Sequence, residues 1–374
     1  MNRLLERKPL IAAEKRAKPA AVCVTGGASY IACSVVARLL AAGHTVRATY
    51  RPSAATKPIV SALDALPGAA ERLRWFAADL LEDGSFDEAM TGCKFVIHTA
   101  CPVIIGVPKA QAYEKLIGPA VRGTQNVLRS VNRAGSVEKV VMTSSEAAVF
   151  GDAPPGHTFT EADFNTACLR VGSAYGMAKT LSEWQAWAIA GQQNRWRLVT
   201  LCPGVVLGPP VVPNYKSESV LEVKKLVDGT HWPYAPPTGH ATVDIDDVAA
   251  AHTLAMCIPE AHGRYLLAER GADIPTWAAM LRGMYPSRWV PRKVLPNWLV
   301  MAVLRLRGDE GGIQWVKAEY HKHKVDCSKA QKQLGLSFIP LERSLRDLVD
   351  RMVEDGVLPV QPAGTANEAV AKTD

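Results

Sequence analysis

Tyr175 and Lys179 stand four residues apart, so on a helix their side chains lie on one face. A free phenol titrates near about pH 10, and an adjacent ammonium group favours its ionised form. A tyrosine in such a pair can therefore act as a general acid or base. Ser145 ends a hydrophobic run upstream and is placed to hydrogen-bond the same substrate oxygen. We predict that these three residues are catalytic.

The same spacing occurs a second time, at Tyr320 and Lys324. Tyr320 belongs to the C-terminal part of the chain and has no cofactor-type strand before it. Tyr175 instead follows a nucleotide-binding half and a strand that ends in Thr143-Ser-Ser145. The chemistry is therefore assigned to Tyr175, with a packed tyrosine beside a surface lysine as the alternative.

The stretch from Val22 to Ala32 predicts a cradle for the phosphates of a dinucleotide. A β-branched run breaks into small residues and then into a helical pattern, which lets pyrophosphate oxygens reach the N–H groups of a helix N-terminus. In the pattern G-x-x-G-x-x-G, Gly26 takes the first place, but Ser29 and Ala32 take the second and third. A βα unit that binds no ligand remains the alternative.

The residues that follow give this turn its context and favour one cofactor. A helix over 34–42 ends at Gly43, which suits a C′ position, and a strand over 45–50 completes a βαβ unit. A carboxylate at the end of that strand would bind the ribose of NAD, but the chain has Arg51 there and Lys57 soon after. Because a guanidinium matches a phosphate, NADP is favoured over NAD.

Four more β-type runs alternate with helical patterns, at 74–78, 95–100, 140–145 and 198–203. This order predicts an α/β fold, a Rossmann-type doubly wound parallel sheet with a smaller C-terminal substrate-binding lobe. Asp79 follows one of the strands and is a candidate for contact with the adenine side of the cofactor. Proline-rich sequence begins after residue 208, while Val243 to His252 returns to the core.

We therefore divide the chain into four parts. Residues 1–19 form an N-terminal extension, 20–208 an NADP-binding Rossmann domain, 209–358 a substrate-binding lobe in which 240–256 return to the core, and 359–374 a disordered tail. The basic N-terminus resembles an organellar targeting segment, but Glu6 and Glu14 argue against that reading because transit peptides are poor in acids.

Composition narrows the class of protein. The chain has 374 residues, 48% of them hydrophobic, and a net charge of +7 from scattered basic residues, so nucleic acid is not an expected partner. Eight widely spaced cysteines lack metal-ligand spacing and indicate a reducing compartment, so we expect no metal. We expect a cytoplasmic, soluble protein, monomeric or homodimeric, that acts on a small-molecule carbonyl substrate.

No apolar run approaches the ~20 residues of a membrane-spanning helix, and the longest candidate is 298–304. Its basic flanks, Arg292, Lys293, Arg305 and Arg307, allow a helix at a membrane surface. A helix of the substrate lobe that closes over the substrate is the favoured interpretation.

Over about residues 20–358 the chain resembles the extended short-chain dehydrogenases/reductases, in the branch of dihydroflavonol, anthocyanidin and cinnamoyl-CoA reductases. The resemblance rests on Val22–Ala32, 46–51, 78–80, 84–89, 98–100, 123–126, 141–145, 175–179, 203–209 and 246–252. It implies a Ser145, Tyr175 and Lys179 triad, with Lys179 also on the nicotinamide ribose and Pro203 near the nicotinamide. The cofactor-binding residues it implies are Gly26, Ser29, Tyr30, Ile31, Arg51, Lys57, Asp79, Leu80, Thr99, Ala100, Tyr175, Lys179 and Pro203.

The expected function is NADPH-dependent reduction of a ketone or aldehyde, as in dihydroflavonol reductases. The alternatives are a 3β-hydroxysteroid-type dehydrogenase and a cofactor-binding protein without turnover, which Ser29 in the glycine pattern makes conceivable. The cinnamoyl-CoA reductase signature is missing around Tyr175, and Phe150 stands where dihydroflavonol reductases carry an asparagine. Glu146 follows Ser145 directly and is either a polar wall of the pocket or a surface glutamate.

Overall fold

The structure, a computed structural model, describes residues 9–360 except 103–106, 108, 152, 155, 172, 307, 309–312 and 314–323. Its centre is a seven-stranded sheet in the order β11-β7-β5-β4-β1-β2-β3, in which all neighbouring strands are parallel. The predicted fold class is confirmed. The strands are β1 (Ala21–Thr25), β2 (Thr45–Tyr50), β3 (Leu73–Ala77), β4 (Phe95–His98), β5 (Lys139–Thr143), β7 (Arg197–Pro203) and β11 (Gly263–Leu267).

The chain reverses direction across this sheet between β1 and β4. From β1 it winds outward through β2 to β3, then crosses back and continues from β4 on the other side. In doubly wound sheets, ligands bind at such a switch point, outside the carboxyl ends of the strands. The loops after β1 and β4 therefore frame the expected cofactor crevice.

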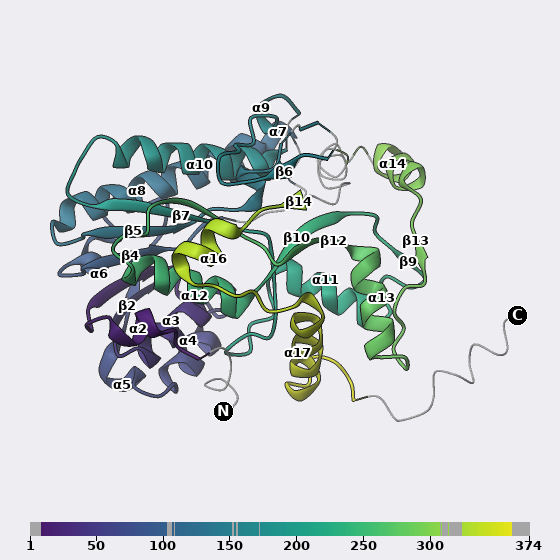
Figure 1. The fold of residues 1–374 in the computed structure, drawn as a ribbon, viewed down its shortest axis with the longest axis horizontal. Coiled ribbons are helices and arrows are strands. Elements are labelled where there is room, and N and C mark those ends of the chain that lie inside the picture. The colour runs from purple at the N-terminus through teal and green to yellow at the C-terminus, as the bar shows by residue number, and fades with distance from the viewer. Residues whose placement is uncertain are drawn as a thin grey trace, which may run out of the picture.

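Helices cover both faces of the sheet (Figure 1). On one face α3 packs against α12, and α2 against α12. On the other face α8 contacts both α6 and α10. Separate clusters of buried apolar side chains fill the two sides. These helices are α2 (Ala12–Arg16), α3 (Tyr30–Ala41), α6 (Asp87–Met90), α8 (Gly118–Ala134), α10 (Ala174–Ala190) and α12 (Ile245–Cys257); α4 (Lys57–Asp64) and α5 (Ala69–Arg72) lie between β2 and β3.

The second part of the chain builds a smaller sheet in the order β12-β10-β8 beside the large one (Figure 1). Strand β10 is parallel to β8 and antiparallel to β12. Two short pairs, β13 with β9 and β14 with β6, join distant segments. The elements are β6 (Thr158–Phe159), β8 (Val205–Leu207), α11 (Glu218–Val227), β9 (Tyr234–Ala235), β10 (Gly239–Asp244), β12 (Arg270–Asp273), α13 (Ile274–Met284), β13 (Lys293–Val294), α14 (Asn297–Leu306), β14 (Lys324–Val325), α16 (Ser328–Leu334) and α17 (Leu341–Glu354).

More of the C-terminal half returns to the core than residues 240–256. Helix α12 covers the large sheet as expected, but β11 also adds the outermost strand of that sheet beside β7. The sequence of β11 is a short apolar run that no helical pattern follows. Its place in the large sheet could therefore not be predicted from the sequence.

The N-terminal extension is partly docked on the large domain. Helix α2 lies against α12, and Glu14 is 1% exposed. Its carboxylate accepts a hydrogen bond from Arg38 Nε at 2.6 Å and another from the Thr253 hydroxyl. A buried carboxylate needs such partners, and only folding brings them to it.

Three predictions on composition can be compared with the described residues. In this part of the chain no helix is both long and apolar enough to cross a membrane. All eight cysteines are free, and only Cys101 and Cys257 are more than marginally exposed. Between residues 9 and 360, as far as they are described, no three His, Cys, Asp or Glu side chains gather as metal ligands.

Candidate active site

Two adjacent glycines shape the turn between β1 and α3. Gly26 has a φ of 67°, and a Cβ there would lie 3.1 Å from the Cα of Ala100. A Cβ on Gly27 would lie 2.8 Å from the Cβ of Ala48. Gly26 thus permits the left-handed turn next to the β4 loop, while Gly27 permits close packing on β2. Gly27 is not among the predicted site residues.

Ser29 is the N-cap residue of α3, and its exposed side chain caps no backbone N–H of the helix. Tyr30 begins the helix, and its hydroxyl donates to the carbonyl oxygen of Gly208 at 2.5 Å. The Tyr30 side chain is therefore engaged inside the protein. What Tyr30 and Ile31 offer to a phosphate is their backbone N–H, because the first N–H groups of a helix lack helical partners.

Thr25 joins the loops at the switch point. Its hydroxyl accepts from Ala100 N at 3.2 Å and lies 2.8 Å from His98 Nδ1, and its carbonyl oxygen accepts from Thr99 Oγ1 at 2.6 Å. Burial lowers the pKa of His98 to about 3, and the positive charge of Lys179 adds to the effect, so this ring is neutral. The predicted residues Thr99 and Ala100 lie beside Gly26. Thr25 was not predicted as a site residue, although its position directly before Gly26 in the sequence could have indicated it.

The cations predicted for the 2′-phosphate lie at the two ends of one loop. Arg51 directly follows β2 and Lys57 begins α4, and both are exposed. Thr56 shapes the loop, because its hydroxyl donates to the Arg51 carbonyl oxygen at 3.1 Å and its N–H donates to Ser53 Oγ at 3.2 Å. No carboxylate stands at the end of β2. The loop suits a phosphate better than a bare ribose.

Asp79 and Leu80 follow β3 on the same edge of the sheet. Asp79 Oδ1 accepts from Leu81 N at 2.8 Å, which holds the carboxylate in a turn. The Leu80 carbonyl oxygen accepts from Asn126 Nδ2 at 2.9 Å, and the Leu80 side chain lies over Gly123, where a Cβ would be 3.1 Å away. Their contact with the adenine side of a cofactor stays a prediction.

Tyr175 and Lys179 both lie in α10, as the spacing predicts. Ser173 caps this helix by accepting from Gly176 N at 3.2 Å. The Nζ atom of Lys179 lies 5.9 Å from the centre of the Tyr175 ring, and the lysine is buried.

The pKa of Lys179 reflects opposing effects. Burial lowers it, but the Cys101 and Tyr175 side chains and a hydrogen bond to the Cys101 sulfur outweigh burial and raise the pKa above its usual range. Lys179 therefore keeps its proton at neutral pH. Cys101 is half-exposed at this site, although it is not among the predicted site residues. Its position directly after Ala100, a predicted cofactor-binding residue, could have indicated that it lies at the site.

Ser145 follows β5 and caps the short 3₁₀ turn η2 (Glu146–Ala148) by accepting from Ala147 N at 3.2 Å. This leaves its hydroxyl proton to donate. Helix α10 packs against η2, and Ser144 Oγ donates to Glu183 Oε2 at 2.6 Å, which ties the strand end to the helix. Ser145, Tyr175 and Lys179 thus lie on two elements in contact.

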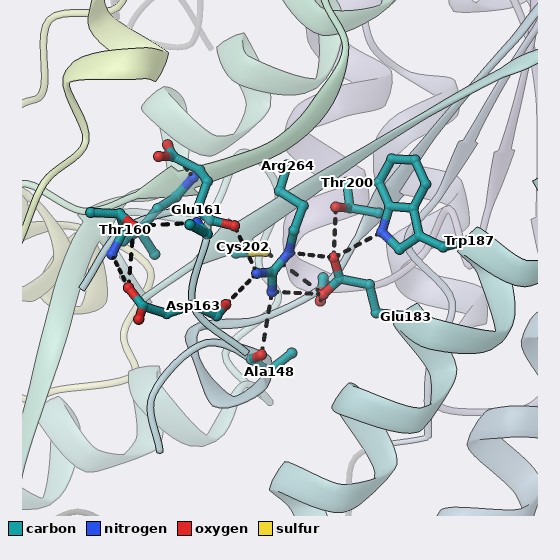
Figure 2. A network of polar contacts seen from close by, with 12 residues as sticks. Ala148, Thr160, Glu161, Asp163, Glu183, Trp187, Thr200, Cys202 and Arg264 are labelled. Atoms are coloured by element: carbon teal, nitrogen blue, oxygen red, sulfur yellow. Dashed lines mark hydrogen bonds and ion pairs between the residues drawn. The ribbon is translucent and has the colours of Figure 1, made fainter. Parts of the chain in front are cut away.

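A buried ion pair supports this junction (Figure 2). Arg264 Nε lies 2.7 Å from Glu183 Oε1, and its Nη2 donates to the Ala148 carbonyl oxygen at 3.3 Å. Thr200 and Trp187 also donate to Glu183, at 2.8 and 3.2 Å. The pair is not among the residues predicted from the sequence. Glu183 continues the i, i+4 series of Tyr175 and Lys179, but Arg264 is brought in by β11.

The structure decides between the two interpretations of Glu146. The residue is 8% exposed, and its Oε2 accepts from Ala241 N of β10 at 3.1 Å. His240 Nδ1 lies 3.9 Å from Oε1. The surface alternative is therefore wrong, and Glu146 is a buried polar group beside Ser145. Pro203, predicted near the nicotinamide, is buried at the end of β7 opposite Leu267.

Comparisons with known proteins show which family the chain belongs to. Residues 22–266 match the model of the NAD dependent epimerase/dehydratase family. The chain is 36% identical over 341 residues to cinnamoyl-CoA reductase CAD2 of Medicago truncatula, covering 89% of this chain and 95% of the relative. It is 38% identical over 286 residues to a putative anthocyanidin reductase of Ginkgo biloba, covering 73% and 82%.

Solved structures are also similar. Gre2 of Candida albicans in complex with NADPH superposes with a TM-score of 0.73 at 26% identity, covering 90% of this chain and 99% of that one. Vestitone reductase of alfalfa gives 0.71 at 25% identity, covering 91% and 100%. The predicted enzyme class, an oxidoreductase that uses NADP, is confirmed by these relatives. The chain belongs to the NAD dependent epimerase/dehydratase family, as an extended short-chain dehydrogenase/reductase.

Proposed function

We propose that this protein reduces a ketone or aldehyde with NADPH, in the manner of the dihydroflavonol reductases, through Ser145, Tyr175 and Lys179. The observation that carries the proposal is the buried ammonium of Lys179, 5.9 Å from the Tyr175 ring, on a helix that packs against the turn capped by Ser145. Tyr175, Lys179 and Ser145 would then supply an acid, a cation and a hydrogen-bond donor at the edge of a sheet of the cofactor-binding type.

The residues present fit NADPH. The Gly26 turn has no room for a Cβ beside Ala100, and the N-terminus of α3 follows it. Arg51 and Lys57, exposed at the end of β2 and the start of α4, are the cations that we assign to the 2′-phosphate. Asp79, Leu80, Thr99, Ala100 and Pro203 extend along the same edge. When bound, NADPH supplies the hydride from C4 of its nicotinamide.

The chain's own groups handle the proton and the charge. Tyr175 gives its hydroxyl proton to the carbonyl oxygen as the carbon is reduced. Ser145 donates a hydrogen bond to that oxygen and stabilises the negative charge that develops on it. Lys179 stays protonated, because its pKa is raised overall, and it stabilises the phenolate left on Tyr175.

The surroundings favour a medium-sized, largely apolar substrate. Tyr175 and Cys101 pack against a cluster of buried apolar side chains, Val107, Ala112, Leu116, Ile117, Ala120 and Ala178. Glu146 offers a polar group on the side of β10. In this proposal residues 20–208 hold the cofactor and 209–358 form the substrate lobe.

The test measures oxidation of NADPH with a panel of aldehydes, aromatic and aliphatic ketones, and measures NADPH binding separately by fluorescence. Tyr175→Phe is expected to lower kcat by about two to four orders of magnitude, because it removes the proton donor, while NADPH still binds. Tyr320→Phe is the matched control, since Tyr320, which lies outside the described residues, shares the spacing to a lysine but is assigned no chemistry.

Three results would contradict the proposal. Turnover that Tyr175→Phe leaves intact would remove the tyrosine from the chemistry. NADPH binding without turnover on any carbonyl would favour the binding-only alternative. Oxidation of a 3β-hydroxysteroid with NAD in preference to reduction with NADPH would instead select the dehydrogenase.

A further inference from the structure

Apolar side chains gather on one exposed part of the C-terminal half. Within the described residues, thirteen large hydrophobic side chains are exposed, and eight of these lie within 232–234 and 289–306. Helix α14 buries none of its residues, although eight of its ten are apolar. Trp298 is 72% exposed and Leu306 is 88% exposed. We call this set the α14 surface: Trp232, Tyr234, Trp289, Val294, Trp298, Leu299, Val303 and Leu306.

The α14 surface is a local assembly. Strand β13 pairs with β9, which places Lys293 opposite Tyr234. The rings of Trp232 and Trp289 lie 5.1 Å apart, edge to face. Helix α14 follows β13 after two residues, and Figure 1 shows α14, β13 and β9 together at the rim of the molecule, away from the large sheet. A monomeric protein rarely leaves so many large apolar groups together in water.

The charges within this surface have one sign. Between residues 286 and 306 there are four cations, Arg288, Arg292, Lys293 and Arg305, and no Asp or Glu. Arg292 lies 6.0 Å from the centre of the Trp232 ring, and Lys293 Nζ lies 5.9 Å from that of Tyr234. The cations thus accompany the exposed aromatic rings. Arg307 lies outside the described residues.

We propose that the α14 surface docks this protein on an anionic lipid membrane. Indole and aliphatic side chains enter the interface between headgroups and acyl chains, while arginine and lysine reach the lipid phosphates. Ten residues of helix are about 15 Å long, far short of the ~30 Å hydrocarbon core, so the helix lies in the interface.

The charge argues against a second copy of the chain as the occupant. In a two-fold symmetric contact each copy presents the same patch, so the cations of one copy would face those of the other. An anionic bilayer complements them. The proposal does not depend on the reaction, and both can fail independently.

The test is co-sedimentation of the full chain with vesicles of phosphatidylcholine alone and with vesicles that also contain phosphatidylglycerol. We expect binding to the anionic vesicles, weakened by salt. Trp298→Ser/Leu306→Ser is expected to abolish it. Arg292→Glu/Lys293→Glu is expected to weaken it by about tenfold or more, since each cation near an anionic surface counts for about 1 kcal/mol.

Matched controls separate these effects from misfolding. Tyr113→Ser removes an aromatic ring that is 74% exposed elsewhere, and Lys224→Glu/Lys225→Glu reverses another adjacent cation pair, in α11, that has Asp228 and Glu222 beside it. Both controls should bind vesicles as the wild type does.

The proposal is overturned if the wild type sediments with neither kind of vesicle, or if the Trp298→Ser/Leu306→Ser variant sediments like the wild type. A dimer in light scattering that this variant converts to a monomer, with no vesicle binding, would assign the surface to a second copy. Unchanged vesicle binding by the variant with a raised KM for carbonyls would assign α14 to a substrate lid.

Discussion

Arg264 and Glu183 form an ion pair at 2.7 Å whose side chains are 7% and 0% exposed. The pair bridges β11 and α10 and also reaches the turn that Ser145 caps, through the Ala148 carbonyl oxygen. A charge buried this deeply is tolerated only with its partner in place. Helix α10, which carries Tyr175 and Lys179, is therefore held beside the end of β5 by two residues 81 positions apart.

Glu183→Gln is expected to destabilise the protein by about 3–5 kcal/mol, because it leaves the Arg264 cation buried without its counter-charge. Urea unfolding measures the change. Glu138→Gln is the control, since the Lys94–Glu138 pair is 48% and 60% exposed and should contribute about 1 kcal/mol or less. Equal losses of unfolding free energy in the two variants would show that burial does not determine how much the Arg264–Glu183 pair stabilises the protein.

Arg51→Glu/Lys57→Glu is expected to reverse cofactor preference. Losing charge-assisted bonds to the 2′-phosphate, and placing carboxylates there, should raise KM for NADPH by about tenfold or more and leave KM for NADH little changed. Steady-state rates with both cofactors measure this. Lys332→Glu, an exposed cation in α16, is the control. If the KM values for NADPH and NADH rise equally, the 2′-phosphate does not bind at this loop.

Gly26→Ala is expected to weaken NADPH binding as well as stability. The new Cβ would be 3.1 Å from the Ala100 backbone at a φ of 67°, so the two loops of the cradle must separate. Gly92→Ala is matched, with a φ of 73° and nothing within 4 Å of the Cβ. Both should cost about 1–2 kcal/mol of backbone strain in unfolding experiments, but only Gly26→Ala should raise the Kd for NADPH. A similar Kd for the two variants would mean that the cradle is elsewhere.

Asp244 makes stability depend on pH. Burial and the nearby Asp246 raise its pKa to about 7, although the Ser344 hydroxyl and Asp246 N donate to its oxygens. The folded state therefore keeps a proton that the unfolded chain releases at about pH 4. The contribution of Asp244 to the free energy of unfolding is therefore greatest below about pH 4 and is lost as the pH rises to about 7. The charged groups acting on it are Asp246 and Asp247, and Arg343 and Asp347 line the same pocket.

Asp244→Asn is expected to flatten this part of the profile, because asparagine does not titrate; its Oδ1 still accepts from Asp246 N, and its Nδ2 donates to the Ser344 hydroxyl, which accepted no bond from Asp244 before. Thermal unfolding between pH 4 and about pH 8 measures the difference from the wild type. Asp347→Asn serves as the control, since this carboxylate is 42% exposed. An unchanged slope in Asp244→Asn would show that Asp244 ionises normally.

Features that depend on short-range order follow from the sequence alone. The alternation of strands and helices, the Gly26 turn, the C′ role of Gly43 with its φ of 86° and the shared face of Tyr175 and Lys179 each arise within a few residues. Backbone sterics and the helical period set them wherever the chain goes. The fold class and the family followed from such patterns.

Tertiary structure alone decided which distant groups meet. Glu14 pairs with Arg38, Glu146 accepts from Ala241, and Arg264 reaches Glu183, in each case between elements that periodicity does not connect. The partner of a buried charge cannot be predicted from the sequence, because the pairing depends on how sheets and helices pack. The exposure of α14 was decided in the same way, since its apolar sequence fits a covered helix equally well.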